Sequence, residues 1–136
     1  MKIEGGCYCG AVRYEAEGEP TLRAQCYCRE CQYIAGGGPN TFMLMPLEGF
    51  RYTKGAPSQF ARADIENPYT REFCSTCGTH LVTRRADLPA IVIKAGTLDD
   101  PRQFGLPAMA LFTGEKQPFH IVPEGVRSFE RSPQRG

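Results

Sequence analysis

The sequence predicts an all-β or β-rich protein built from short antiparallel strands. Fifteen glycines and eleven prolines divide its 136 residues into short segments, which favours many short strands over long helices. Within these segments apolar and polar residues alternate, as in half-buried strands. The length and the 41% hydrophobic content fit one domain of ordinary composition. We therefore expect a single domain over residues 1–132, followed by a frayed tail at 133–136.

The first expected strand covers residues 11–16, where Val12 and Tyr14 point to the same face. A Gly-Glu-Pro turn follows it and closes the strand. Residues 22–24 then lead into a cysteine-rich loop. One short helical turn is expected at 32–35, because three consecutive glycines come directly after it.

The rest of the chain predicts further strands separated by proline and glycine. The β-branched run at 90–93 is short and apolar, as expected of a buried central strand. Residues 96–101 predict a turn with a short helical segment. The other expected strands are 41–45, 50–53, 59–63, 69–73, 81–84 and 108–112. The large aromatic residues expected in the core are Phe42, Phe50, Tyr52, Phe60, Phe73 and Phe104.

Seven cysteines in three tight clusters indicate metal binding. Such short spacings suit chelation better than cross-linking. Disulfides are further disfavoured because the count is odd and the first residues contain no apolar segment of a secretory signal. A reducing, cytoplasmic setting is therefore expected. Seven cysteines are enough for two zinc ions, and the alternative is one zinc ion with spare buried thiols. The clusters are Cys7 and Cys9; Cys26, Cys28 and Cys31; and Cys74 and Cys77.

The clusters divide most simply into a group of four and a group of three. If the three neighbouring cysteines stay together, the two remaining pairs form a four-thiolate site, and any other division requires more loop-closure entropy. A structural zinc has four protein ligands, whereas a reactive zinc has three and one open position. We therefore predict a structural site on the quartet (Cys7, Cys9, Cys74 and Cys77) and an open, reactive site on the trio (Cys26, Cys28 and Cys31).

Charge and hydropathy argue against two classes of partner. The formal net charge is +1, which provides no basic field to attract nucleic acid. No apolar run approaches the length needed to span a membrane. We expect neither a nucleic acid nor a membrane as a partner.

An open three-thiolate zinc site favours sulfur chemistry. Three thiolates outweigh the charge of the zinc ion, so its natural fourth ligand is soft, and another sulfur suits it. Coordination lowers the pKa of a thiol, and a thiolate held in this way can attack a carbonyl or leave from a carbon–sulfur adduct. The predicted chemistry is the making or breaking of a carbon–sulfur bond on a small thiol.

The ordered cysteine motifs resemble the glutathione-dependent formaldehyde-activating enzyme family over roughly residues 3–120. The segments that carry the resemblance are GGCYCGAVRYE at 5–15, CYCRECQ at 26–32, FCSTCGT at 73–79 and GTLDDP at 96–101. The resemblance implies a β-tent-like zinc fold with two zinc ions, a structural one on the quartet and a catalytic one on the trio. It also implies the family's named activity, S-(hydroxymethyl)glutathione synthase, a carbon–sulfur lyase that joins formaldehyde to glutathione.

Two parts of the chain depart from the pattern of the family. Ala35 stands where many members carry Ser or Thr before the glycine that follows the trio. Ala-Leu-Phe at 110–112 and Pro-Phe at 118–119 stand where many members show a His-Ile-Trp type segment and a Pro-Trp pair. The chain could therefore be a relative of these enzymes that acts on another thiol or on another adduct.

Several other residues invite a functional interpretation. His80 and His120 are predicted to be polar strand or loop residues, because neither lies at metal-ligand spacing from another histidine. The glycines at 36–38 are predicted to form a turn rather than an anion-binding nest. Arg29 is expected to be solvated, although it follows a trio cysteine and could meet a carboxylate. Arg84, Arg85 and Lys94 could meet the carboxylates of an acidic thiol such as glutathione.

Two functions are thus predicted. The first is a zinc-dependent carbon–sulfur lyase that acts on an adduct of a small thiol of the glutathione type through the trio. The alternative is a non-catalytic, zinc-stabilised module that binds a protein partner.

Overall fold

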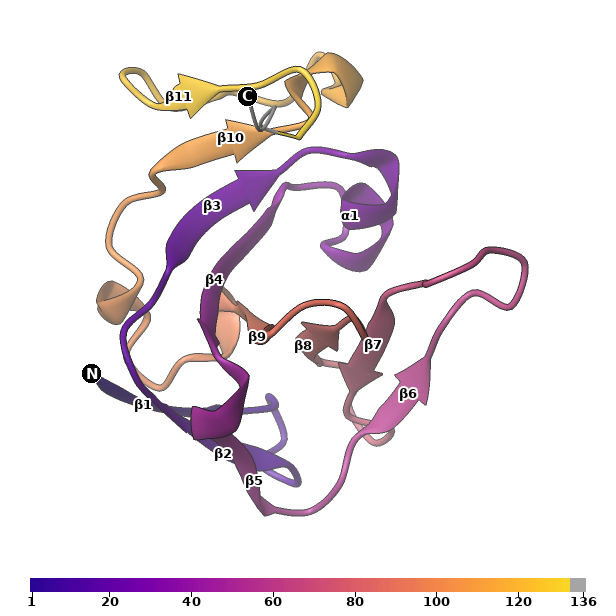
Figure 1. Ribbon diagram of the computed structural model, residues 1–136, viewed down its shortest axis with the longest axis vertical. Coiled ribbons are helices and arrows are strands. Elements are labelled where there is room, and N and C mark those ends of the chain that lie inside the picture. The colour runs from indigo at the N-terminus through magenta and orange to yellow at the C-terminus, as the bar shows by residue number, and fades with distance from the viewer. Residues whose placement is uncertain (133–136) are drawn as a thin grey trace.

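A computed structural model describes residues 1–132, and within this range strands dominate (Figure 1). The β-rich class predicted from the sequence is confirmed. The tail expected at 133–136 lies outside the described residues. None of the helices in the described range is both long and apolar enough to cross a membrane.

A small antiparallel sheet carries the N-terminus in the order β1-β2-β5. Its strands are β1 (Lys2–Gly6), β2 (Arg13–Glu17) and β5 (Phe50–Lys54). The sequence predicted the last two but not β1, which ends in two glycines and has only one large apolar residue, the buried Ile3. Pairing along the whole length of β2 holds β1 in place.

The large sheet has the order β11-β10-β3-β4-β9-β8-β7-β6. Its strands are β3 (Leu22–Cys26), β4 (Asn40–Pro46), β6 (Ser58–Phe60), β7 (Thr70–Phe73), β8 (His80–Arg84), β9 (Ala90–Lys94), β10 (Met109–Leu111) and β11 (Arg127–Ser128). The helical segments are α1 (Arg29–Ile34), η1 (Leu47–Gly49), η2 (Ala95–Thr97), η3 (Pro101–Gln103) and η4 (Thr113–Glu115).

The expectation of purely antiparallel strands is wrong at one edge of the large sheet. There β10 pairs in parallel with both β3 and β11. Parallel neighbours require a crossover rather than a hairpin, and the long connection at 112–126 provides it between β10 and β11. The other pairs of the large sheet are antiparallel.

The two faces of the large sheet pack against different groups of residues. In β9, Ile91 and Ile93 belong to the main core, whereas Val92 packs with two cysteines of the trio. Because side chains alternate along a strand, Lys94 lies on the face of Val92. Burial of each large core side chain stabilises the fold by about 1.5–3 kcal/mol. The main core, which also includes small-sheet residues, contains Ile3, Val12, Tyr14, Ala16, Met43, Met45, Leu81, Val82, Ile91 and Ile93.

A buried carboxylate joins the two sheets near β6. Glu72 on β7 accepts hydrogen bonds from Tyr52 Oη at 2.6 Å, Gln59 Nε2 at 2.8 Å and Arg84 Nε at 2.8 Å. Phe60 follows Gln59 on β6, the edge strand of the large sheet, where both residues are exposed. Phe60 is 59% exposed, so its predicted place in the core is wrong. Phe42 and Phe104 are buried as predicted, and Phe50, Tyr52 and Phe73 are half-buried.

Candidate metal centres and active-site cleft

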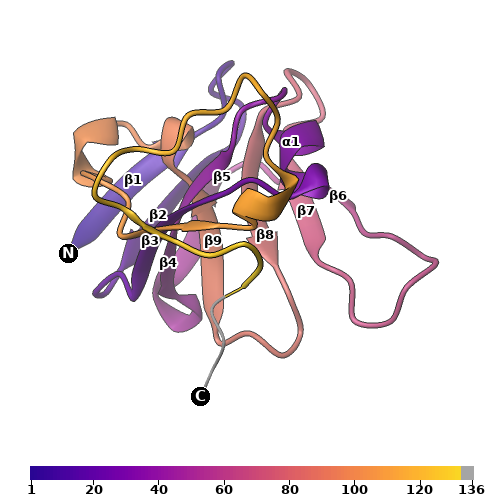
Figure 2. The same cartoon turned by 90° about the horizontal axis from the view of Figure 1, so that it is seen from above.

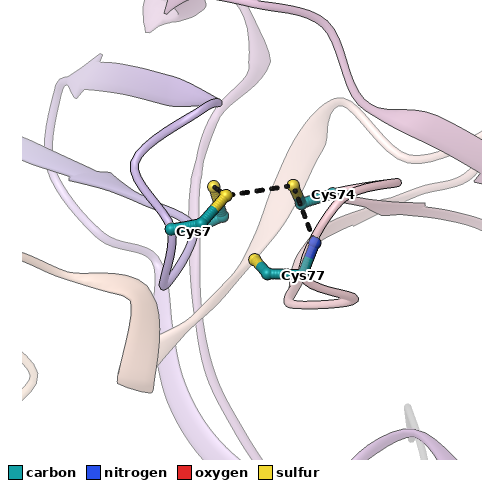
Figure 3. A group of neighbouring side chains, drawn as sticks. Cys7, Cys74 and Cys77 are labelled. Carbon is teal, nitrogen blue, oxygen red and sulfur yellow. Dashed lines mark hydrogen bonds between the residues drawn. The ribbon is translucent and has the colours of Figure 1, made fainter.

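The quartet is assembled from two loops that are far apart in sequence. Cys7 and Cys9 come from the β1–β2 loop, and Cys74 and Cys77 from the β7–β8 loop (Figure 3). The Cys9 sulfur lies 3.7 Å from that of Cys7 and 3.8 Å from that of Cys74. Tetrahedral zinc with Zn–S bonds of about 2.3 Å requires sulfur–sulfur distances of about 3.8 Å. The quartet therefore fits a zinc ion.

Both loops are shaped to present sulfur atoms. Val12 N donates to Cys7 Sγ at 3.2 Å, and Cys77 N donates to Cys74 Sγ at 3.5 Å. Gly78 has a φ of 77°, a left-handed conformation that glycine adopts without strain, and its amide donates to Cys74 O at 2.8 Å. The hydrogen bond from Val12 N favours the thiolate form of Cys7.

Thr79 connects the two loops of the quartet. Its hydroxyl accepts a hydrogen bond from Tyr8 N at 3.1 Å and lies 3.1 Å from Cys77 Sγ. The hydrogen bond from Thr79 lowers the pKa of Cys77 to about 5. Cys77 is therefore prepared for metal binding, which requires the deprotonated sulfur.

The trio lies at the junction of β3 and α1. Cys26 is the last residue of β3, Cys28 is the N-cap of α1, and Cys31 lies in its first turn. The three sulfurs lie within 4.8 Å of one another. Helix α1 begins at Arg29, earlier than the turn predicted at 32–35, because Cys28 Sγ accepts a hydrogen bond from Cys31 N at 3.4 Å.

One thiol of the trio ionises much more easily than the others. Hydrogen bonds, first from the Cys26 thiol and then from the Cys31 thiol, hold the pKa of Cys28 well below its usual range. Cys26 and Cys31 are buried, whereas Cys28 is half-buried. The trio thus combines one readily ionised sulfur near the surface with two buried thiols, and three sulfur donors fit a soft metal ion such as zinc.

The trio forms part of the wall of a cleft of about 630 Å³. No cysteine of the quartet lines this cleft, so the two groups differ in access. Its apolar wall is formed by Leu22, Phe42, Leu44, Leu88, Val92, Leu111 and Phe112, and its charged residues are Arg29, Glu30, Arg71, Arg85 and Glu115. Leu111 and Phe112 belong to the segment that departs from the family pattern, and Phe112 has a φ of 55°, a strained conformation for an aromatic residue.

Lys94 places a buried positive charge beside the trio. It is only 8% exposed, and its ammonium group has no hydrogen-bond partner among the described residues. Burial lowers the pKa of Lys94 to about 8, against the opposing effect of the nearby Cys31 thiol. A buried charge is costly unless an opposite charge accompanies it. Thiolates of the trio are the natural counter-charge.

The arginines expected to meet a carboxylate are distributed differently from the prediction. Arg85 does line the cleft. Arg84 does not, because its guanidinium pairs with Glu72 at 2.8 Å. Sequence reasoning missed Arg71, which lines the cleft from β7 and lies 3.5 Å from a Glu30 oxygen. Arg29 is exposed, as expected, and it also lines the cleft, where it hydrogen-bonds to Gln32 and stacks over the ring of Tyr33.

His120 and the glycine run have structural roles, as predicted. His120 Nδ1 accepts a hydrogen bond from Gln117 N at 2.8 Å, and its Nε2 lies 2.5 Å from Gly37 O. Gly37 N donates to Gln32 O at 2.7 Å, so this amide is not free to bind an anion. His80 differs, since its Nδ1 is buried without a hydrogen-bond partner among residues 1–132. Burial, followed by the charges of Lys94 and Arg71, lowers the pKa of His80.

Comparison with known proteins agrees with this geometry. The family model described as "Glutathione-dependent formaldehyde-activating enzyme" matches residues 2–115. A crystal structure of a Rhodobacter sphaeroides protein has a similar fold, with a TM-score of 0.61 and 22% identity over 77% of this chain and 97% of that one. At this identity the likeness supports the fold alone. No curated protein matches the chain. Because the family match spans most of the chain and includes every cysteine of both groups, the protein belongs to the glutathione-dependent formaldehyde-activating enzyme family.

Proposed function

We propose that the protein is a zinc-dependent enzyme of the carbon–sulfur lyase type, which joins a small thiol of the glutathione type to an aldehyde and catalyses the reverse cleavage. The observation that carries the proposal is the trio itself. Its three thiols line a cleft, and no fourth cysteine, histidine or carboxylate of residues 1–132 groups with them. A donor set of three leaves a position for a visiting ligand.

The residues around the trio suit this reaction. A zinc ion bound by Cys26, Cys28 and Cys31 would supply a soft Lewis acid with affinity for a thiol. In the forward direction the thiol sulfur bonds to the carbonyl carbon, and the thiol proton ends on the carbonyl oxygen. The buried charge of Lys94 offsets the negative charge that the trio and an incoming thiolate bring together.

The cationic residues of the cleft provide the recognition of a carboxylated thiol. Arg85 and Arg71 line the same cleft as the trio and the apolar residues contributed by β3 and β4. A guanidinium group binds a carboxylate through two parallel hydrogen bonds. Glutathione carries two carboxylates and one thiol, and we propose that at least one carboxylate pairs with these arginines while the sulfur lies at the trio.

Exchange NMR tests the proposal directly. With ¹³C-labelled formaldehyde and glutathione, we expect the metal-loaded protein to accelerate exchange between free aldehyde and adduct in proportion to protein concentration, with two zinc ions per chain by elemental analysis. Spontaneous exchange measured without protein is the reference. Two zinc ions without any acceleration would contradict the enzyme and favour the alternative, a zinc-stabilised module that binds a protein partner. A content of one zinc ion per chain would contradict the proposal that the trio holds a second, reactive zinc ion.

Lys94→Met tests the role of the buried ammonium group. The side chains are similar in length, and the Lys94 ammonium group has no hydrogen-bond partner among the described residues, so its loss leaves no acceptor without a hydrogen bond. We expect the affinity for glutathione to fall at least about tenfold, because one opposite charge close to the thiolate is lost. The measurement is the absorbance change of the cobalt-substituted protein when glutathione is added. The exposed Lys2→Met is the matched control, and unchanged thiol affinity in Lys94→Met would assign Lys94 a structural role only.

A further inference from the structure

A second cavity of about 650 Å³ adjoins the trio cleft. The two share four wall residues, Glu30, Tyr69, Arg71 and Arg85. The second cavity lies between α1 and the segment that links β6 to β7, which projects from the body of the molecule in both views (Figures 1 and 2). Glu30 holds this segment against α1, because its carboxylate contacts Arg62 at 3.3 Å and Arg71 at 3.5 Å.

The walls of the second cavity are mostly apolar. They are formed in large part by Tyr33, Ile34, Phe60, Ile65, Pro68, Tyr69 and Phe73. Phe60 is 59% exposed and Ile65 is 43% exposed, so both present apolar surface without a partner in the described part of the chain. A cavity of this size with mostly apolar walls is typical of a site for a small organic molecule.

Two residues that line the second cavity also carry a buried polar atom without a hydrogen bond. His80 Nδ1 is buried and has no partner within residues 1–132. Arg85 Nε is likewise without a hydrogen bond, although it lies 3.3 Å from an Asp87 oxygen. Buried polar groups normally have hydrogen-bond partners. Because both atoms are fully buried, the accessible walls indicate the ligand, and these walls suit a molecule with an apolar body.

We propose that the second cavity receives the organic group of the aldehyde, so that the substrate is the adduct of a carboxylated thiol with an aldehyde much larger than formaldehyde, of the size of benzaldehyde. This inference rests on the proposed function. Its basis is the continuity of the second cavity with the trio cleft. A one-carbon aldehyde would leave this volume and its apolar surface unused. The reaction stays balanced, since the sulfur bonds to the aldehyde carbon, the carbonyl becomes a hydroxyl group, and the thiol proton completes that hydroxyl.

Two stable thioethers distinguish a small from a large organic group. S-methylglutathione and S-benzylglutathione share the glutathione part and differ only in the group on sulfur. On the metal-loaded protein, we expect calorimetry to show that the benzyl compound binds at least about tenfold more tightly, because the ring buries apolar area. The double variant Phe60→Ala and Ile65→Ala should lose most of this preference and keep its affinity for the methyl compound.

A matched variant controls for the loss of surface aromatic and aliphatic residues. Phe119→Ala with Ile121→Ala removes the same two residue types from exposed positions that line neither cavity, and it should keep the full preference for the benzyl compound. Equal binding of both thioethers to the wild type would overturn the inference while leaving the proposed function intact. A preference that survives in the Phe60 and Ile65 variant would place the benzyl group elsewhere and overturn it as well. Absence of thioether binding together with absence of formaldehyde exchange would overturn the proposed function itself.

Discussion

Cys74→Ser is expected to leave the chain largely unfolded. Cys74 is 1% exposed and belongs to the main core, and its sulfur connects the β7–β8 loop with Cys9, 65 residues earlier. Structural zinc sites contribute on the order of 10 kcal/mol or more of apparent binding free energy. This is comparable to the whole stability of a typical domain, about 5–15 kcal/mol. Circular dichroism should show loss of the cooperative thermal transition.

Removal of the metal gives an independent test of the same site. A strong chelator should unfold the wild type to the same end state as Cys74→Ser, and zinc should restore the folded state of the wild type but not of the variant. A Cys74→Ser protein that melts cooperatively within a few degrees of the wild type would show that the quartet is not a structural metal site.

Cys28→Ser is expected to abolish turnover without unfolding the protein. Cys28 is half-buried and is the N-cap of α1, and serine is a preferred N-cap residue. The helix therefore keeps its cap while the trio loses a thiolate ligand. We expect the zinc content to fall from two ions per chain to one, and the acceleration of thiol–aldehyde exchange to disappear.

The thermal transition of Cys28→Ser separates function from stability. It should stay close to that of the wild type, in contrast to Cys74→Ser. If the two variants are equally destabilised, the trio holds a structural metal and the assignment of an open site fails. Retention of two zinc ions and full exchange in Cys28→Ser would show that Cys28 is not a ligand.

Local spacing carried most of the information about the cysteines. The short separations within each cluster and the entropy of loop closure predicted the same two groups that the structure brings together. Alternation likewise predicted β2, and the β-branched run predicted β9. These features depend on contacts between near neighbours in the sequence, so a pattern in one segment suffices to indicate them.

Features that depend on contacts between distant segments could not be predicted from the sequence. Strand β11 contains only two residues, both exposed, and exists because β10 lies beside it. Phe60 looked like a core residue, yet its short strand β6 lies at the edge of the large sheet, where Phe60 is 59% exposed. The position of Lys94 beside the trio follows from the register of β9 against β4, where it lies opposite Phe42. No local pattern reports any of these pairings.

The large sheet packs the main core on one face and lines the cleft on the other, and this separation has an evolutionary consequence. Interior packing depends on residues such as Ile91 and Ile93, whereas Val92 lines the cleft from the same strand. Point changes on the side of the cleft can therefore alter which molecules fit while the interior keeps its stability. A scaffold arranged in this way allows relatives to diverge in the compounds they process and still retain one shared framework.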